Sequence, residues 1–418
     1  MNSPDPLTAL ARHPLTPALL RAAAGRSLHL VGGVLRDALL GLPPHDFDIV
    51  VAGGGEEVAG RLARELPARL VRLGGERFAA WRLVAESFQV DLWDRGDADL
   101  ASDLARRDFT VNSLALEPRT AEVSDPHGGR GDAERRRLRA TTPLSLASDP
   151  LRILRMARFA GPPWRLRPDP DTVALARRAR EGLDAVPSER LREEIDRVLG
   201  AEDARPGVEL LGRLGLLEWL AGVPPAPERA AGARAAVGRL ERALALLGRT
   251  GAAPGPAARV SARFAVLAAA AGGPPEELVD RVRRARRRGV LSRARAAVAE
   301  RLLAAGAPPG DAVARRRFLH AAGDLWGLAL CVAAARAGEV ESVADRLRRL
   351  DELARAEGAA IFDPPPLLDG HEIQRRLGLP PGPELGRLAD LLRQAQVEGR
   401  VADRDEALEL LRAAARRR

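Results

Sequence analysis

Residues 30–51 read LVGGVLRDALLGLPPHDFDIVV, and this stretch decides the fold of the N-terminal part of the chain. In the wider context SLHLVGG, residues 28–33 are a short apolar strand that runs into two glycines. VLRDALLGL then has apolar residues at helical spacing. FDIVV (Phe47–Val51) contains several β-branched residues and predicts a second strand. The order is therefore strand, turn, helix and strand.

Working outward, residues 69–84 and 88–93 predict further short strands around a Gly74-Gly75 turn. From about Ser145 onward, Leu, Ala, Arg and Glu recur at spacings of three and four, which is typical of amphipathic helices. We therefore expect an α+β fold, with a head of mixed sheet and helices followed by an all-helical neck, body and tail. The expected boundaries are 1–140, 141–220, 221–340 and 341–418. Pro- and Gly-rich helix breaks are expected at 223–227, 251–256, 272–275 and 363–366.

The composition favours a multidomain protein with a possible polyanionic partner. The chain has 418 residues, more than one domain usually holds. All 66 of its basic residues are Arg, against 57 acidic residues, which gives a formal net charge of +9. Guanidinium forks suit phosphate oxygens. A GC-rich genome that writes Arg for Lys would give the same totals, so composition alone leaves both explanations open.

Cysteine content and hydropathy indicate a soluble protein. Cys331 is the only cysteine, so no disulfide or Cys-based zinc site can form within one chain, which fits the cytoplasm. The N-terminus has no charged start followed by an apolar core. The longest apolar stretch, 325–335, is too short to cross a bilayer. We expect a cytoplasmic protein that does not enter the membrane, and the sequence does not indicate its oligomeric state.

Asp46 and Asp48 are the first candidates for chemistry. Side chains at i and i+2 of a strand share one face, so the two carboxylates lie side by side. Their repulsion favours a bound cation, and oxygen ligands suit Mg²⁺, which bridges the reacting phosphate in phosphoryl transfer. A pair of this kind can also decorate a solvated strand end.

Three neighbouring features support the chemical interpretation. Gly32 and Gly33 lie at a strand-to-helix turn whose free N–H groups can cradle a triphosphate, with Arg36 one helical turn later. An ordinary tight turn would also use two glycines. Asp91, in FQVDLW, could add a third carboxylate from a neighbouring strand, or could be a solvated strand residue.

The stretch 30–51 resembles the signature of the class II tRNA nucleotidyltransferase and bacterial poly(A) polymerase family, within the polymerase-β-like superfamily. Later segments resemble the second to fifth family motifs in order: ARRDFTVNSLAL (105–116), DPHGGRGDAERRRLRA (125–140), SDPLRILRMARFA (148–160) and SERLREEIDRVL (188–199). Segment 367–399 resembles the end of the bacterial tRNA nucleotidyltransferases, whereas 221–316 is too diverged to align. Five matches in the same order as the family motifs are very unlikely to arise by chance.

The resemblance implies a polymerase-β-like nucleotidyltransferase head that adds C or A to the 3′ end of tRNA. The tRNA 3′-hydroxyl attacks the α-phosphorus of CTP or ATP, and pyrophosphate leaves. Asp46 and Asp48 would carry two Mg²⁺ ions, and Asp91 would assist deprotonation of the hydroxyl. The helical region would hold the tRNA through its phosphates, so tRNA, CTP and ATP are the expected partners.

One helix face is expected to carry four polar side chains at a spacing of three: Asp149, Arg152, Arg155 and Arg158. The resemblance implies that Asp149 and Arg152 hydrogen-bond the Watson–Crick edge of the incoming base, with the next two arginines assisting. It also makes Arg107 a nucleotide contact. A helix with surface salt bridges would show the same spacing.

Several other residues receive structural or uncertain assignments. Asp108 and Asn112, in the second motif, are expected to be structural. Asp125 and Gly128–Gly129 are expected to shape a turn that supports the pocket. The basic run RVRRARRR (281–288) is a candidate tRNA contact, although such a run is more often a solvated face.

The histidines do not suggest a second active site. His320 and Asp324 lie four residues apart with no further His nearby, so we expect no metal phosphohydrolase activity. His45, His127 and His371 are expected to be turn or hydrogen-bonding residues rather than metal ligands.

Two departures from the family bear on specificity. The segment between Asp91 and Arg106 is shorter than the loop that full CCA-adding relatives carry, as in CC-adding relatives, so partial activity is a serious alternative. Ser148 stands where the family usually has Glu. The rivals are a poly(A) polymerase, whose basic segment is missing from residues 74–80, and a non-catalytic RNA-binding protein, which would be expected to lose Asp46 and Asp48 first.

Overall fold

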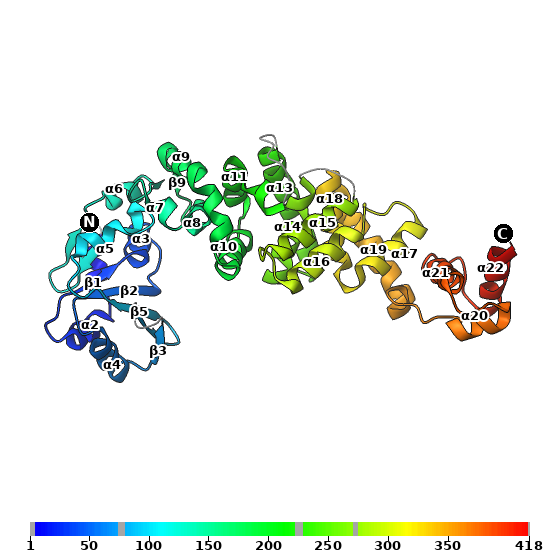
Figure 1. Cartoon of the computed structure of the whole chain (residues 1–418), viewed down its shortest axis with the longest axis horizontal. Helices are drawn as coiled ribbons and strands as arrows, with labels where there is room; N and C mark the ends of the chain where they lie inside the picture. The colour runs from blue at the N-terminus through cyan, green and yellow to red at the C-terminus, as the bar shows by residue number, and fades with distance from the viewer. Residues whose placement is uncertain (1–4, 74–79, 222–228, 271–274, 417–418) are drawn as a thin grey trace. The chain divides into compact units, whose positions relative to one another are not determined.

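The computed structural model describes residues 5–73, 80–221, 229–270 and 275–416. The chain divides into two compact units, Met1–Leu214 and Gly215–Arg418 (Figure 1). The finer division at residues 140, 220 and 340 stays a prediction. The predicted Gly74-Gly75 turn, the break at 223–227 and most of the break at 272–275 lie outside the described residues.

The first unit is built on a mixed seven-stranded sheet with the order β3-β4-β5-β2-β1-β6-β7. Only β2 and β5 run parallel, and the other neighbours are antiparallel. The strands are β1 (Leu28–Val31), β2 (Asp46–Val51), β3 (Arg69–Leu73), β4 (Ala80–Val84), β5 (Gln89–Asp94), β6 (Ala115–Glu117) and β7 (Glu122–Ser124). The predicted strands are confirmed, while β6 and β7 were not predicted.

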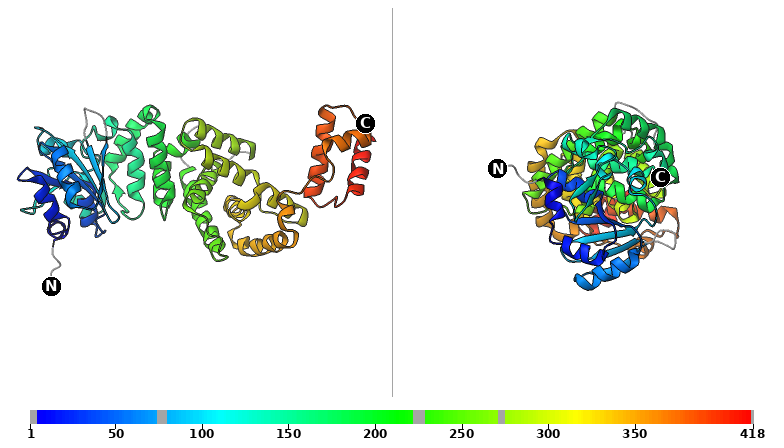
Figure 2. Two further views of the ribbon diagram at one scale, coloured as in Figure 1. Left: turned by 90° about the horizontal axis from the view of Figure 1, so that it is seen from below. Right: turned by 90° about the vertical axis from the view of Figure 1, so that its left-hand side faces the viewer.

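Helices cover the two faces of this sheet unequally (Figure 2). On one face, α1, α2 and α4 pack on alternate strand residues, among them Leu30, Phe47 and Ile49. On the other face, α5 covers only a small cluster around Val31 and Val50. The helices of this part are α1 (Pro6–Ala11), α2 (Thr16–Ala23), α3 (Gly33–Leu39), α4 (Gly55–Glu65), α5 (Leu100–Ala105) and α6 (Gly129–Glu134).

This unequal cover leaves part of one sheet face open. Because Phe47 and Ile49 point into the larger core, Asp46 and Asp48 must point to the face that α5 only partly covers. The same alternation puts Val90 and Leu92 of β5 in the core and Asp91 on the open face. The fold therefore places the predicted carboxylates together on an uncovered sheet surface.

The rest of the first unit is mainly helical, with α7 (Ser145–Ser148), α8 (Leu151–Ala160), α9 (Pro170–Ala179), α10 (Ser188–Gly200) and α11 (Arg205–Arg213). Residues 110–112 and 180–185 form the short 3₁₀ helices η1 and η2. The prediction that only helices follow Ser145 is wrong at one place. There, β9 (Arg167–Pro168) pairs with β8 (Arg137–Leu138), in a two-residue strand without any β-branched residue to indicate it.

The described part of the second unit is helical. Its α helices are α12 (Leu216–Ala221), α13 (Arg229–Gly248), α14 (Pro256–Ala270), α15 (Pro275–Arg287), α16 (Arg293–Ala304), α17 (Ala312–Ala322), α18 (Trp326–Ala337), α19 (Val343–Glu357), α20 (Gly370–Leu377), α21 (Pro383–Val397) and α22 (Arg404–Arg416). Its 3₁₀ helices are η3 (Gly323–Leu325), η4 (Val340–Ser342) and η5 (Gly358–Ile361). The predicted breaks at 251–256 and 363–366 are confirmed, and α20, α21 and α22 share a core of their own.

One helical stretch of this unit, Ala312–Ala337, has the length and mean hydropathy of a membrane span. However, 67% of its most apolar window is buried inside the protein. Gly323, with a φ of 55°, also separates α17 from α18 within it. The stretch therefore serves as a core helix pair of this unit.

Candidate active site

A cavity of about 720 Å³ in the first unit brings together every residue predicted for the site. Its walls come from the open sheet face, the start of α3, the segment before η1, and α8. The predicted residues that line it are Gly32, Gly33, Arg36, Asp46, Asp48, Asp91, Arg107, Asp149, Arg152, Arg155 and Arg158. Residues from three separate motifs, together with Asp91, thus meet in one recess.

Three carboxylates lie on the open sheet face. Asp48 on β2 is directly opposite Asp91 on β5 in the parallel register, and Asp46 lies two residues before Asp48. The Asp46 side chain is 72% exposed, and one of its oxygens lies 2.9 Å from Nδ1 of His45. That contact agrees with the hydrogen-bonding role expected for His45.

Asp48 is a carboxylate whose pKa the fold raises strongly. Burial raises the pKa of Asp48 from its ordinary 3.8 to about 6, and the charge of Asp91 adds to the rise. The guanidinium groups of Arg107 and Arg36 and the N–H of Gly33 oppose it. A half-buried carboxyl that resists ionisation in this way is stabilised when a cation takes the place of its proton.

Arg82 of β4 completes this row of charges and was not predicted. It is paired in register with Asp91, and its Nε and Nη2 donate to the two Asp91 oxygens at 2.7 and 2.8 Å. Alternation on β4 could have indicated its face, since Trp81 and Leu83 on either side are core residues. Its pairing with Asp91 depends on sheet register, which the sequence does not show.

The donor set fits a metal that is shared with a substrate. Within the described ranges, no group of three or more His, Cys, Asp or Glu side chains is placed to hold a metal ion. Asp91 is engaged by Arg82, which leaves the pair Asp46 and Asp48. Mg²⁺ is usually bound by one or two carboxylates together with substrate phosphates, so two carboxylates are sufficient.

The glycine turn differs from the predicted phosphate cradle. Gly32 has a φ of 72°, and a Cβ there would lie 3.0 Å from Oδ2 of Asp48 and 3.1 Å from Nη1 of Arg107, so the turn requires glycine. The Gly32 N–H is not free, because it donates to the Leu114 carbonyl at 3.3 Å. The Gly33 N–H acts on the Asp48 carboxyl and lowers its pKa. The Gly32 amide of the predicted cradle is therefore not free in this conformation.

Arg36 is also committed to protein partners. Its Nη1 donates to Oδ1 of Asn112 and its Nε to Oδ1 of Asp37, both at 2.8 Å. Its guanidinium lies over the rings of Phe159 and Trp164, at 4.9 Å from each centroid. Arg36 thus stiffens the wall of the cavity between α3 and α8.

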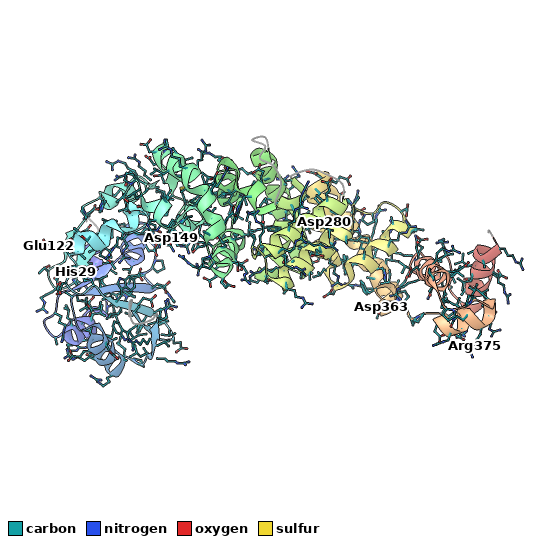
Figure 3. The ribbon with its side chains drawn as sticks, in the orientation of Figure 1. His29, Glu122, Asp149, Asp280, Asp363 and Arg375 are labelled. Atoms are coloured by element: carbon teal, nitrogen blue, oxygen red, sulfur yellow. The ribbon has the colours of Figure 1, made fainter. Side chains whose placement is uncertain are left out.

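Asp149 does not lie on the helix predicted for it. It has an extended backbone between α7 and α8 (Figure 3), because the ring of Pro150 disfavours the helical conformation of the preceding residue. One Asp149 oxygen accepts from Nη2 of Arg190 at 2.9 Å. Arg152, at the start of α8, donates to the carbonyls of Arg106 and Ser145 at 2.7 and 3.0 Å.

Buried acids balance the arginines of α8. Nε of Arg155 and Nδ2 of Asn112 each donate to Asp108 at 2.8 Å. Burial by itself would raise the pKa of Asp108, but Arg155 and the hydrogen bonds lower it to about 2. Asp108 is therefore permanently charged, which agrees with the structural role expected for Asp108 and Asn112.

Glu194 of α10 is a second buried acid, and it was not predicted. Its carboxylate is 2% exposed and lies 3.3 Å from Nε of Arg158 and 3.9 Å from Nη1 of Arg155. Burial lowers the pKa of Arg158 to about 10, although Glu194 opposes the shift. The apolar side of α8 is buried as predicted, at Ile153, Leu154 and Ala157.

Two assignments remain, one for Asp125 and one for the basic run 281–288. Asp125 accepts from the N–H groups of Gly129 and Arg130 at 2.7 and 3.0 Å, which confirms its turn role. The role of the basic run 281–288 stays a prediction, since Arg283, Arg286 and Arg287 are exposed. Arg281 is 5% exposed and donates to the Ala268 carbonyl, and Arg288 lies over the Trp219 ring.

Two family profiles match the chain. "Poly A polymerase head domain" matches residues 28–139, and "Probable RNA and SrmB- binding site of polymerase A" matches residues 165–227. A CC-adding tRNA nucleotidyltransferase of Geobacter sulfurreducens is 31% identical over 97% of this chain and 93% of its own length. A CCA-adding enzyme of Bordetella bronchiseptica is 36% identical over 54% of this chain and 64% of its own length.

The solved structures that resemble the chain agree on the fold. A Thermotoga maritima CCA-adding enzyme complexed with tRNA has a TM-score of 0.67 at 22% identity, with 98% of each chain covered. A Bacillus stearothermophilus CCA-adding enzyme in complex with CTP has a TM-score of 0.64 at 23% identity, with 99% of this chain and 98% of that chain covered.

Proposed function

Because the chain belongs to the family of CC- and CCA-adding tRNA nucleotidyltransferases, we propose that it extends the 3′ end of tRNA with C, A or both, using CTP and ATP and Mg²⁺. The chain is a metal-dependent nucleotidyltransferase that releases pyrophosphate. The observation that carries the proposal is the meeting of Asp46 and Asp48 with Asp149 and Arg152 in one cavity. A cytoplasmic location fits this substrate.

The carboxylate face would perform the transfer. Asp46 and Asp48 would hold Mg²⁺, which neutralises the phosphate charge that develops as the tRNA 3′-hydroxyl attacks the α-phosphorus. Asp91, held by Arg82, would accept the proton of that hydroxyl. Pyrophosphate leaves on the opposite side of the phosphorus. Arg107, beside Gly32 and Asp48, would add positive charge next to the reacting phosphate.

The opposite wall would select the base. The Asp149 carboxylate can accept a hydrogen bond from the amino group of cytosine or adenine, and the Arg152 guanidinium can donate to the adjacent ring nitrogen. Uracil and guanine present the reverse pattern to this pair. Both side chains now hold protein partners, Arg190 and the carbonyl of Arg106, so binding of a base would exchange these contacts for new ones.

The first test removes the metal pair. Asp46→Ala and Asp48→Ala should abolish incorporation of radiolabelled CTP into tRNA that lacks its 3′ end, whereas Asp97→Ala, an exposed aspartate outside the cavity, should keep it. Retained transfer in both cavity variants would refute the proposed mechanism.

A second candidate is CC addition alone. The segment after Asp91 is short and folded against its neighbours: Asp94 accepts from the N–H groups of Gly53 and Gly55, and Asp99 caps α5. The segment is therefore unlike the longer loop expected in full CCA-adding relatives, and the Geobacter sulfurreducens relative is named as CC-adding.

The two products can be separated directly. Transfer RNAs lacking CCA, CA or A are each incubated with CTP or ATP alone, and the lengths of the products are resolved. Efficient use of ATP on the tRNA that lacks only A would exclude CC addition alone. Long adenosine tails would support the poly(A) polymerase, which is the weaker alternative.

A further inference from the structure

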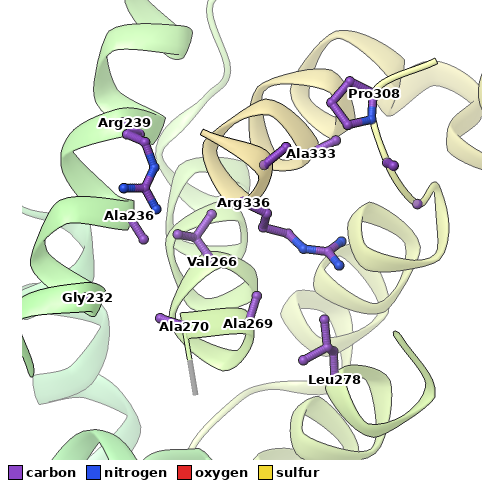
Figure 4. A pocket seen from close by; sticks show the side chains of 13 residues that line it. Gly232, Ala236, Arg239, Val266, Ala269, Ala270, Leu278, Pro308, Ala333 and Arg336 are labelled. Atoms are coloured by element: carbon purple, nitrogen blue, oxygen red, sulfur yellow. The ribbon is translucent and has the colours of Figure 1, made fainter. Parts of the chain in front are cut away.

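The second unit contains a recess of about 480 Å³ that the nucleotidyl transfer does not use. It lies between α13, α14 and α18, and α15 and residues 306–308 close its sides (Figure 4). Most of its wall is small and apolar, with Val266, Ala269, Leu278 and Ala333 among the lining residues. Its volume falls in the range of small-molecule sites.

Arg336 is the anomaly in this recess. It lies in the last turn of α18 and reaches across the opening toward Leu278 (Figure 4). No hydrogen bond or ion pair with any described residue satisfies it, and its Nη1 is buried without a partner. Burial accordingly lowers the pKa of its guanidinium. A guanidinium nitrogen that is buried without a partner is unfavourable.

The two most deeply buried arginines described in this unit have partners. Nε of Arg263 donates to Glu241 at 2.7 Å, and Nη1 of Arg281 donates to the Ala268 carbonyl at 2.8 Å. Arg336 has no such partner among the described residues, and it lines the open recess.

A second cation lies beside it. Arg239 comes from α13 on the other side of the recess, and its Nε donates to the Ala335 carbonyl at 2.7 Å (Figure 4). This bond fixes Arg239 next to the residue that precedes Arg336 and leaves its terminal nitrogens for a ligand. The described lining residues include no acidic side chain. Two cations in an apolar recess attract an oxyanion.

We propose that Arg239 and Arg336 bind a phosphate group in this recess, and that the apolar wall accepts the carbon atoms of the molecule that carries it. The phosphate can belong to a free small molecule or to the tRNA backbone. The second source rests on the proposed function, whereas the first does not.

The test compares Arg336→Met with Arg242→Gln in the full-length protein. Arg242 is an exposed residue on α13 outside the recess, so its variant controls for loss of a positive charge. Thermal unfolding is followed in potassium phosphate and in potassium chloride of equal ionic strength. Phosphate should raise the Tm of the wild type and of Arg242→Gln with the logarithm of its concentration, and should raise that of Arg336→Met less.

Unfolding without phosphate gives an independent check. Because Arg336→Met removes an unpaired buried charge, its Tm in potassium chloride should equal or exceed that of the wild type. A lower Tm of this variant, or an unchanged response to phosphate, would overturn the proposal. Phosphate that binds in the catalytic cavity affects all three proteins alike and cancels in the comparison.

Filter binding of tRNA identifies the source of the phosphate. If it belongs to the tRNA, Arg336→Met should lower the affinity at 0.1 M salt by about tenfold and reduce the salt slope by about one, relative to Arg242→Gln. If the ligand is a free phosphate, the two variants should bind tRNA equally while the difference in Tm remains. This result does not depend on the proposed catalytic residues. If Asp46→Ala and Asp48→Ala kept their activity, the difference in phosphate response between Arg336→Met and the wild type would still stand.

Discussion

Arg82 compensates part of the negative charge of the three carboxylates in the catalytic cavity. Arg82 holds both oxygens of Asp91, and the hydrogen bond and charge of Asp91, followed by the charges of Asp46 and Asp48, raise the pKa of the Arg82 guanidinium against the effect of burial. Arg82 therefore interacts with all three acids, while Arg107 and Arg36 also act on Asp48. A metal that binds at Asp46 and Asp48 adds to this charge balance, so Arg82 should influence how strongly the site attracts it.

Substitution of Arg82 tests this balance. In Arg82→Gln the three carboxylates lose the positive charge of Arg82, so the metal-free protein should have a lower Tm and should gain more from Mn²⁺ or Mg²⁺ than the wild type does. Arg72→Gln, an exposed change on β3 outside the cavity, should behave as the wild type. An equal metal-induced rise in Tm for all three proteins would show that Arg82 does not act on the metal site.

The pKa of Asp48 predicts a pH dependence of stability. Since the folded pKa is about 6 and the ordinary value is 3.8, proton binding favours the folded state. This stabilisation is present below about pH 4 and is lost as the pH rises through 6, with an upper limit of about 3 kcal/mol. The metal-free wild type should therefore lose stability relative to Asp48→Asn over this range in urea unfolding.

Metal should reverse this trend above pH 6. Mg²⁺ competes with the proton of Asp48, so its stabilising effect on the wild type should grow with pH and should be weak in Asp48→Asn. A stability difference between the two proteins that is independent of pH would mean that Asp48 titrates at its ordinary value.

At the scale of elements, the sequence predicted strands and helices from their repeating patterns of apolar residues. It did not predict contacts between residues of separate elements. Strands β1, β2, β4 and β5 carry enough alternation to be predicted, whereas β6, β7 and β9 have two or three residues each. The break at Asp149 was detectable, because Pro150 follows it. The pairings of Arg82 and Glu194 depend on contacts between separate elements, which one sequence does not reveal.

The packing of α10 against α8 gives a prediction for Glu194. Its buried carboxylate is the counter-charge of Arg158 and assists Arg155, so Glu194→Ala should leave buried guanidinium charge uncompensated and cost about 3 kcal/mol in urea unfolding. Glu193→Ala, at a neighbouring position with a 66% exposed side chain, should cost less than about 1 kcal/mol. Equal costs would show that the pairing does not stabilise α8.

At the scale of the whole molecule, each of the two units contains a hydrophobic core cluster of its own. The sheet and its helices have one core, and the C-terminal helices have another. The catalytic cavity is lined only by residues of the first unit. A cut at the unit boundary, Leu214, therefore keeps the whole described cavity and removes the helices of the second unit.

A fragment of residues 1–214 tests whether chemistry and RNA binding can be separated. Because it keeps the whole described cavity and its own core, it should fold cooperatively and should be stabilised by CTP with Mg²⁺ as strongly as the full chain is. Its affinity for tRNA should fall by tenfold or more, and its binding should depend less steeply on salt, since the arginines of the second unit are missing. Asp48→Ala in the same fragment controls for metal-dependent nucleotide binding. Full tRNA affinity in the fragment would assign RNA binding to the first unit and contradict the expected role of the helical region.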